Sequence, residues 1–182
     1  MNFGKVLTAM VTPFDRKGYV DFAKTEQLIN YLINNGTDGL DVAGTTGESP
    51  TLSSEEKVAL FKHSVKVADG RVPIIAGTGS NNTHASIELT KKAEAVGVDA
   101  IMIVAPYYSK PGQKGLYEHF KAIAESTKLP VMIYNIPGRS VVNMTADTIV
   151  ELSKISNIVS VKEASGDLDQ ITDIITRTEE SF

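Results

Sequence analysis

Short apolar segments recur along the chain at intervals of roughly 30 residues, which is the length of one βα unit. They are rich in Val, Ile and Ala, as is typical of strands that are buried on both faces. The six segments are Val6–Pro13, Gly39–Gly44, Pro73–Gly79, Ala100–Pro106, Pro130–Pro137 and Ile158–Gly166. The hydrophobic pattern therefore predicts six strands of a parallel sheet.

The stretches between these segments have the spacing of amphipathic helices, and Ser, Thr or Asp often opens them. In the first stretch, apolar residues recur at Phe22, Leu28, Ile29, Leu32 and Ile33. A last helix is expected from Leu168 to about Thr178. Strands and helices thus alternate along the whole chain.

Two architectures fit six βα units, namely a doubly wound open sheet and a (β/α)8 TIM barrel. The dinucleotide-binding fingerprint that would favour the open sheet is missing after the first strand. A complete barrel needs ~250 residues. We therefore expect an α/β fold in which residues 1–182 form a single barrel domain that holds the first six βα units and stops before strands 7 and 8 and the C-terminal helices. Such a domain would expose sheet edges and apolar surface.

Composition narrows the class of protein. The chain has 182 residues, of which 42% are hydrophobic, so it can bury one core. Its net charge of -4 gives no support for nucleic-acid binding. The absence of cysteine excludes disulfides and a thiol nucleophile. The N-terminus lacks signal-peptide features and no apolar run reaches ~18 residues, so we expect a cytoplasmic protein that does not span a membrane.

Polar residues that are unusual for a core gather where the predicted strands end. They lie in Gly44–Glu48, Pro106–Tyr108, Tyr134–Arg139 and Lys162–Gly166, after the second, fourth, fifth and sixth strands. Parallel α/β proteins place their active sites at the carboxyl ends of their strands. These four segments are therefore expected to meet on one rim.

Lys162 is the strongest candidate for a catalytic residue. Strand alternation places Ile158, Ser160 and Lys162 on one face, and Val159 and Val161 on the face toward the helices. A lysine inside a barrel is desolvated, which lowers its pKa and makes its amine nucleophilic. A strand-end lysine taken alone more often reaches into solvent. The neighbouring residues favour the catalytic interpretation.

Those neighbours offer matching chemistry, although each also has a plain structural interpretation. Tyr134 shares the inward face with Met132, and its phenol can transfer protons. Thr45 and Thr46 offer hydroxyls and backbone amides to a small carboxylate. Arg139 can bind a carboxylate through two hydrogen bonds. A core tyrosine, a tight turn and an exposed arginine are the alternatives.

Other kinds of site have little support. His63, His84 and His119 fall in three separate helical segments and are expected to be solvated, so no metal site is predicted. Gly77–Ser80 lacks the lysine of a phosphate-binding loop, and its glycines are interpreted as serving a tight turn. No serine stands in a nucleophile elbow. An aldolase with these residues would therefore be of the lysine type and not of the metal type.

Four motifs, in order, resemble the dihydrodipicolinate synthase/N-acetylneuraminate lyase family. They are GTTGES (44–49), APYYSKPGQKGLYEHF (105–120), YNIPGRS (134–140) and VKEASGD (161–167). The resemblance covers the whole chain. It implies that Lys162 forms an imine with pyruvate, that Thr45 and Thr46 hold the pyruvate carboxylate, and that Tyr134 and Thr46 relay protons. No cofactor is implied beyond this covalent imine.

The resemblance also implies how the second substrate and a partner subunit take part. Tyr108 is similar to a relay tyrosine that crosses a dimer interface, which implies a homo-oligomer arranged as a dimer of dimers. Arg139 matches the residue that receives the carboxylate of L-aspartate 4-semialdehyde. The reaction would be aldol addition of the pyruvate enamine to that aldehyde, giving 4-hydroxy-tetrahydrodipicolinate on the route to diaminopimelate and lysine.

Two alternatives remain open beside this reaction. One is a related pyruvate lyase that acts on a sugar acid; the Thr45–Thr46 pair and Arg139 favour the synthase. The other is a fragment that folds or associates without catalysis.

Feedback control is expected to be weak. Relatives that lysine inhibits carry His, His and Glu where this chain has Ser54, Lys57 and Ala85, although Asn81 and Tyr107 match. Millimolar lysine is therefore expected to leave the activity of the full-length enzyme largely unchanged, and a clear loss of activity would contradict this.

Overall fold

The computed structural model describes residues 3–182. Its backbone contacts divide the chain into two compact units. The first unit runs to Thr78 and includes Lys91–Ile101, and the second comprises Gly79–Thr90 and Met102–Phe182. Strand β4 (Ala100–Val104) and helix α3 (Thr83–Ala95) therefore each contribute residues to both units.

Each of the six predicted apolar segments contains a strand, so the expected βα repeat is confirmed. Besides β4, the strands are β1 (Leu7–Ala9), β2 (Gly39–Val42), β3 (Ile74–Gly77), β5 (Val131–Asn135) and β6 (Ile158–Glu163). Besides α3, the helices are α1 (Phe22–Asn34), η1 (Ser49–Thr51, a 3-10 turn), α2 (Ser54–Ala68), α4 (Gln113–Ala124), α5 (Pro137–Ser140), α6 (Ala146–Leu152) and α7 (Leu168–Arg177).

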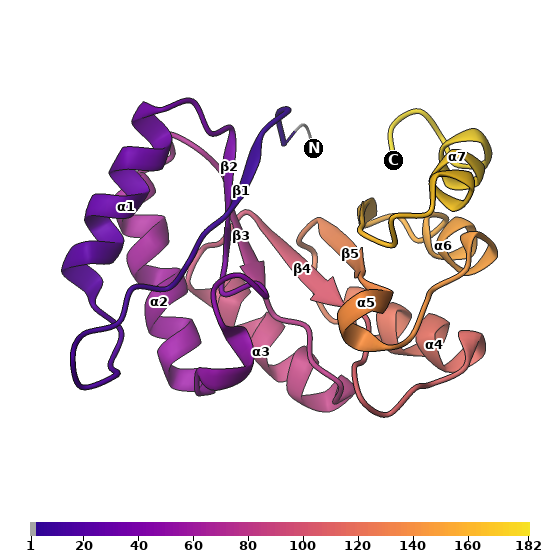
Figure 1. The fold of residues 1–182 in the computed structure, drawn as a ribbon, viewed down its shortest axis with the longest axis horizontal. Coiled ribbons are helices and arrows are strands. Elements are labelled where there is room, and N and C mark those ends of the chain that lie inside the picture. The colour runs from indigo at the N-terminus through magenta and orange to yellow at the C-terminus, as the bar shows by residue number, and fades with distance from the viewer. Residues whose placement is uncertain (1–2) are drawn as a thin grey trace. The chain divides into compact units, whose positions relative to one another are not determined.

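The first unit packs two helices against parallel strands. β1, β2 and β3 are hydrogen-bonded in chain order, with Leu40 opposite Ile74. Helices α1 and α2 lie side by side along this part of the sheet (Figure 1). Ile29 of α1 and Phe61 of α2 are completely buried. β2 and β3 are fully buried, as their apolar patterns predicted, whereas the three residues of β1 are only half-buried.

Helix α2 starts at a reciprocal cap. The Ser53 hydroxyl accepts a hydrogen bond from the Glu56 amide at 3.2 Å, and the Glu56 carboxylate accepts one from the Ser53 amide at 2.8 Å. The bond from the Ser53 amide is the main reason why the pKa of Glu56 lies below its usual value. This capping box fixes the start of the helix and so ends the polar segment that follows β2.

The second unit has the same construction. Its part of β4 is followed by β5 and β6, and the Ala105 amide donates to the Tyr134 carbonyl at 2.9 Å. Helix α6 lies between α4 and α7 (Figure 1). Phe120 of α4 and Ile133 of β5 are completely buried. A packed core thus holds in place the strands whose ends carry Tyr134 and Lys162.

The pairing of β5 with β6 contains an irregularity that the sequence did not predict. Val131 lies opposite Ile158, but the next residue, Met132, lies opposite Ser160, so one extra residue is accommodated in β6. Such a bulge changes the count of alternating faces. The predicted alternation is therefore valid only from Ser160 onward, and in that part of the strand Lys162 lies opposite Tyr134.

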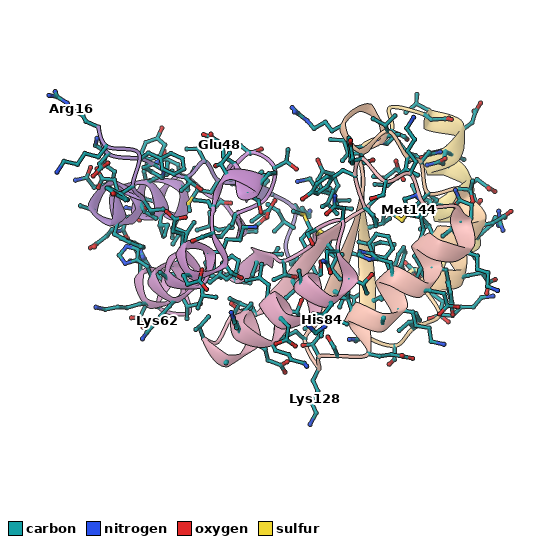
Figure 2. All side chains as sticks on the ribbon, turned by 90° about the horizontal axis from the view of Figure 1, so that it is seen from below. Arg16, Glu48, Lys62, His84, Lys128 and Met144 are labelled. Carbon is teal, nitrogen blue, oxygen red and sulfur yellow. The ribbon has the colours of Figure 1, made fainter. Side chains whose placement is uncertain are left out.

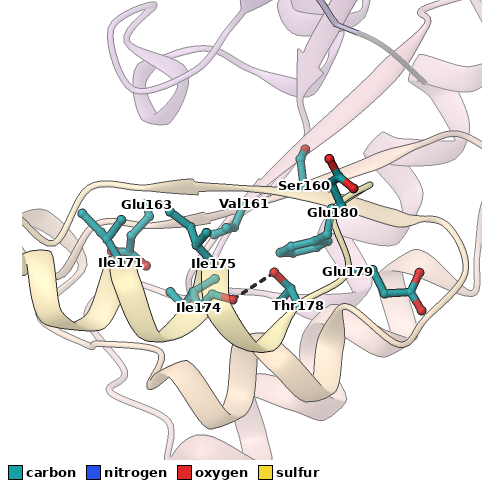
Figure 3. A pocket seen from close by; sticks show the side chains of 10 residues that line it. Ser160, Val161, Glu163, Ile171, Ile174, Ile175, Thr178, Glu179 and Glu180 are labelled. Carbon is teal, nitrogen blue, oxygen red and sulfur yellow. Dashed lines mark hydrogen bonds between the residues drawn. The ribbon is translucent and has the colours of Figure 1, made fainter.

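A cavity of about 490 Å³ lies between β6 and α7 (Figure 3). Its apolar lining includes Val161, Ile171, Ile174 and Phe182. The Thr178 hydroxyl donates to the Ile174 carbonyl at 2.9 Å and closes the last turn of α7. The cavity is a hydrophobic groove beside the strand and does not include Lys162.

The charged residues lie mainly outside these cores. Arg16, Lys62 and Lys128 project away from the ribbon (Figure 2). Among residues 3–182, no helix combines the length and apolar character that crossing a bilayer requires.

Candidate active site

The segment after β2 forms a compact turn in the first unit. The Gly47 amide donates to the Gly44 carbonyl at 3.1 Å, and the buried Thr12 hydroxyl donates to the Gly47 carbonyl at 2.7 Å. Thr45 is half-buried and Thr46 is exposed. Within the described part of the chain, the amides of Thr45 and Thr46 donate no hydrogen bond. The turn therefore presents two hydroxyls and two amide donors that can bind an anion.

Glycine permits the close backbone approach that supports this turn. A Cβ at Gly77, the last residue of β3, would lie 2.3 Å from the Ala43 carbonyl oxygen. A Cβ at Gly44 would lie 2.6 Å from an Asp41 carboxylate oxygen. Gly77 is structural, as the sequence indicated, but the reason is contact between backbones and not a special turn conformation.

Lys162 and Tyr134 lie together in the second unit. They are direct cross-strand partners on β6 and β5, and the Lys162 Nζ lies 4.4 Å from the centroid of the Tyr134 ring. Tyr134 is only 4% exposed. The amine therefore lies over the face of an almost buried ring, in the geometry of a cation–π contact.

A second pair lies directly beyond it, and we did not identify it from the sequence. Asn135 faces Glu163 across the same two strands, and its side-chain nitrogen lies 3.0 Å and 3.1 Å from the two carboxylate oxygens. Asn135 is completely buried. The available signal was position, because Asn135 and Glu163 each directly follow a residue that was predicted to face inward at a strand end.

Arg139 belongs to α5, a single helical turn that starts at Pro137, although a Pro-Gly pair is also typical of a non-helical turn. The Arg139 amide donates to the Ile136 carbonyl at 3.0 Å, and the Ser140 hydroxyl donates to the same carbonyl at 2.9 Å. The Arg139 side chain is exposed, and its guanidinium group forms no hydrogen bond or ion pair with residues 3–182. It is therefore available to an anionic ligand.

Tyr108 lies on the loop after β4 with 89% of its surface exposed. Its φ of 74° is in the left-handed region, which is unfavourable for a bulky side chain. The preceding residue is held in place, because the Tyr107 carbonyl accepts hydrogen bonds from the Ser109 amide at 2.9 Å and from the Asn81 side chain at 3.3 Å. The loop thus presents Tyr108 to solvent in a strained backbone conformation.

The three histidines differ in their surroundings. His84 is exposed, as expected. His119 is not solvated, and that prediction was wrong: it is 6% exposed, its Nδ1 lies 2.8 Å from the Thr83 hydroxyl, and burial lowers its pKa to about 4. His63 is partly buried. Among residues 3–182, no three His, Asp or Glu side chains are arranged to hold a metal ion.

The positions compared with lysine-inhibited relatives lie on two helices. Ser54 and Lys57 are in the first turn of α2, and burial lowers the pKa of the Lys57 amine. Ala85 is an exposed residue near the start of α3. None of the three carries an acidic group or an imidazole, which is the reason for expecting weak inhibition by lysine. That expectation stays a prediction.

Comparisons with known proteins show the family to which the chain belongs. The sequence profile of the Dihydrodipicolinate synthetase family matches residues 2–182. A 4-hydroxy-tetrahydrodipicolinate synthase of Bacillus velezensis is 64% identical over 182 residues, which is 100% of this chain and 63% of that protein. The chain thus spans less than two thirds of the length of this curated relative.

Solved structures show the fold. The crystal structure of a Bacillus anthracis dihydrodipicolinate synthase is 66% identical, with a TM-score of 0.99 over 100% of this chain and 62% of that one. The Acinetobacter baumannii dihydrodipicolinate synthase, solved in complex with pyruvate, is 46% identical, with a TM-score of 0.94 over 96% of this chain and 60% of that one. The expected fold, six βα units of a TIM barrel, is confirmed, and the chain belongs to the dihydrodipicolinate synthetase family.

Proposed function

We propose that this chain carries the pyruvate-binding part of a Schiff-base 4-hydroxy-tetrahydrodipicolinate synthase. The observation that carries the proposal is the position of the Lys162 amine, 4.4 Å from the centroid of the nearly buried Tyr134 ring. A lysine that forms imines needs a fixed position and a neighbour that can move protons. The high identity to curated synthases supports the choice of reaction.

In the proposed reaction, the Lys162 amine adds to the ketone carbon of pyruvate and water leaves, which gives an iminium ion. Loss of a methyl proton converts this ion to an enamine. The enamine carbon attacks the aldehyde of L-aspartate 4-semialdehyde, whose oxygen takes up a proton. The amino group of the adduct then displaces Lys162, closes the ring and restores the free lysine. No cofactor is needed, because the imine itself accepts the electrons.

The remaining residues take roles that fit their surroundings. Tyr134 and Thr46 relay protons, Tyr134 to and from both the carbinolamine and the enamine, since both residues have a hydroxyl group. Thr45 and Thr46 bind the pyruvate carboxylate through the amides and hydroxyls that the turn leaves open. Arg139 binds the carboxylate of the aldehyde substrate, for which its unpaired guanidinium is suited.

The proposal extends to assembly and cellular role. Tyr108 is 89% exposed in a strained backbone conformation, which suits a residue that completes the site of a partner subunit. We therefore propose a homo-oligomer arranged as a dimer of dimers, acting in the cytoplasm in diaminopimelate and lysine biosynthesis. A pyruvate lyase acting on a sugar acid is the competing activity, and comparison of acceptor aldehydes distinguishes the two.

Borohydride trapping with pyruvate tests the imine directly. The chain is incubated with pyruvate, reduced, and examined by intact mass and peptide mapping, with Lys162→Ala as the control. We expect one pyruvate adduct on the peptide that contains Lys162 and none in the variant. A folded chain without an adduct would contradict the proposal for this chain, and an adduct on another lysine would contradict the assignment of Lys162.

A further inference from the structure

The two strands that carry Lys162 and Tyr134 hold a second cross-strand pair directly beyond them. Asn135 and Glu163 are Cα partners, one residue after Tyr134 and Lys162. Because side chains alternate between the faces of a sheet, this pair lies on the face opposite to the lysine. Its members are an amide donor and a carboxylate acceptor at 3.0 Å and 3.1 Å.

Hydrogen bonds occupy nearly every polar atom of this pair. The Asn135 side-chain oxygen accepts from the Met144 amide at 3.0 Å. The Glu163 carboxylate also accepts from the Ser165 amide at 2.9 Å and from the Gln170 side chain at 3.3 Å. A buried amide with its partners in place rigidifies its surroundings, and the same amide without them is costly.

The network continues into the segment that follows Arg139. The Asn135 side-chain nitrogen donates to the Asn143 side-chain oxygen at 2.7 Å, and the Asn143 side-chain nitrogen donates to Gln170 at 2.7 Å. Gln113 of α4 donates to the Asn143 carbonyl at 2.8 Å. One network thus ties β5, β6, α4 and α7 to the segment after α5.

The Asn135–Glu163 pair forms in only one register of β5 with β6. The extra residue near the start of β6 means that a regular ladder running on from the Val131–Ile158 pair would place Tyr134 opposite Val161. In that register Asn135 would face Lys162 and lose its carboxylate acceptor. The observed register places the buried Asn135 amide opposite its carboxylate acceptor, Glu163, and the same register places Tyr134 beside Lys162.

We infer that Asn135 and Glu163 are positioning residues that lock the β5–β6 register and thereby hold Lys162 against Tyr134. The consequence for catalysis rests on the proposed function, because it concerns the imine-forming lysine. The lock itself is a property of the strands and is testable without it.

Exchanging the donor and the acceptor tests the inference. Asn135→Asp places two carboxylates where the present nitrogen and oxygen are 3.0 Å apart, which is unfavourable for two like charges. The double variant, Asn135→Asp with Glu163→Gln, again pairs one amide donor with one carboxylate acceptor, at exchanged positions. We expect Asn135→Asp to slow pyruvate trapping at Lys162 by about tenfold or more, because small misplacements of reacting groups have large effects on rate. The double variant should recover most of the rate.

The control is Glu151→Gln, the same change in an exposed carboxylate that pairs with Lys154 on the surface of the same unit. It should trap pyruvate at the rate of the unmodified chain. Rates are compared only for folded protein, so a loss of stability alone leaves them unchanged. Normal trapping by Asn135→Asp, or failure of the double variant to recover, would overturn the inference.

Hydrogen exchange separates this outcome from failure of the proposed function. The Ala164 amide donates to the Asn135 carbonyl at 2.9 Å and reports on the end of the β5–β6 ladder. We expect its protection to fall in Asn135→Asp and to return in the double variant. If the unmodified chain forms no pyruvate adduct, the proposed function fails for this chain, and the exchange result alone decides the register lock. Unchanged protection in Asn135→Asp would overturn it.

Discussion

The ring and the hydroxyl of Tyr134 contribute separately to the surroundings of Lys162. Tyr134→Phe keeps the ring beneath the amine but removes the proton carrier. We expect the variant to keep the adduct at Lys162 but to exchange the methyl protons of bound pyruvate about 10²-fold more slowly, the usual contribution of a general acid or base. Proton NMR of pyruvate in D2O measures this exchange.

The matched control for that experiment is Tyr117→Phe, which removes a phenol from α4 in the same unit. It should exchange pyruvate protons at the normal rate. Equal rates in Tyr134→Phe and the unmodified chain would show that another group carries the proton.

His119 makes the stability of the fold depend on pH. Burial lowers its pKa from 6.5 to about 4, so the unfolded chain binds a proton more readily between these values. The stabilising contribution is therefore complete above pH 6.5 and is lost as the pH falls toward 4, with an upper limit of about 3 kcal/mol. Urea unfolding between pH 7 and 4 measures the loss.

Replacing the imidazole isolates its share of this dependence. His119→Gln cannot take up the proton, and its amide can still meet the Thr83 hydroxyl, so its stability should fall less steeply over the same pH range. His84→Gln, at an exposed position, should leave the slope unchanged. An unaltered slope in His119→Gln would contradict the assignment.

At the level of single residues, sequence reasoning worked where alternation was regular. It predicted an inward-facing side chain for both Lys162 and Tyr134, and the two share a face because the irregularity in β6 lies before Ser160. The burial of His119 also had a signal: it lies three residues after Leu116 and four before Ile123, on the apolar side of its helix. Its polar character outweighed that spacing in the prediction.

At the level of elements, replacing either of two glycines by alanine is expected to have opposite effects on the stability of the fold. Gly77→Ala would bring a Cβ within 2.3 Å of the Ala43 carbonyl oxygen, and neither backbone can move freely. We expect a loss of about 1–3 kcal/mol. Gly115 lies in the first turn of α4, and the nearest contact of its added Cβ would be 3.4 Å away, so Gly115→Ala should raise the free energy of unfolding by up to about 1 kcal/mol. Chemical denaturation measures the free energy of unfolding of both variants. An unchanged value in Gly77→Ala would contradict the close approach of the Gly77 and Ala43 backbones.

Strand positions were predictable because apolar runs mark them, but the bulge between β5 and β6 was not. The residues at the shift, from Ile158 to Val161, are apolar or small, and none of them favours an extra residue at one place over another. Pairing with the neighbouring strand decides where the extra residue falls. The short helix α5 was missed for a similar reason, since Pro-Gly is also typical of a turn.

At the level of the whole molecule, the groove beside β6 predicts self-association. The outer side of α7 shows Leu168 at 75% and Ile175 at 69% exposure, beside the apolar groove. Exposed apolar surface of this kind promotes contact between chains. We expect sedimentation velocity to show association that rises with protein concentration and that Ile175→Lys weakens.

Thr172→Lys adds the same charge elsewhere on the exposed surface of α7 and serves as the control. It should associate like the unmodified chain. A strictly monomeric chain at high concentration would show that this surface does not promote association.

The six βα units were predictable from the repeat in the sequence, whereas the division into two units depends on contacts between distant residues.

The first unit is not continuous in sequence, and this has a consequence for its synthesis on the ribosome. The Ile74 amide of β3 bonds the Asp99 carboxylate at 2.8 Å, and the Asp99 amide bonds the Ile74 carbonyl at 3.0 Å. At a translation rate of about 5–20 residues per second, Asp99 follows Ile74 by about 1–5 seconds. During that interval the nascent chain holds β3 with one side unpaired, and it is then that the first unit most needs protection from aggregation.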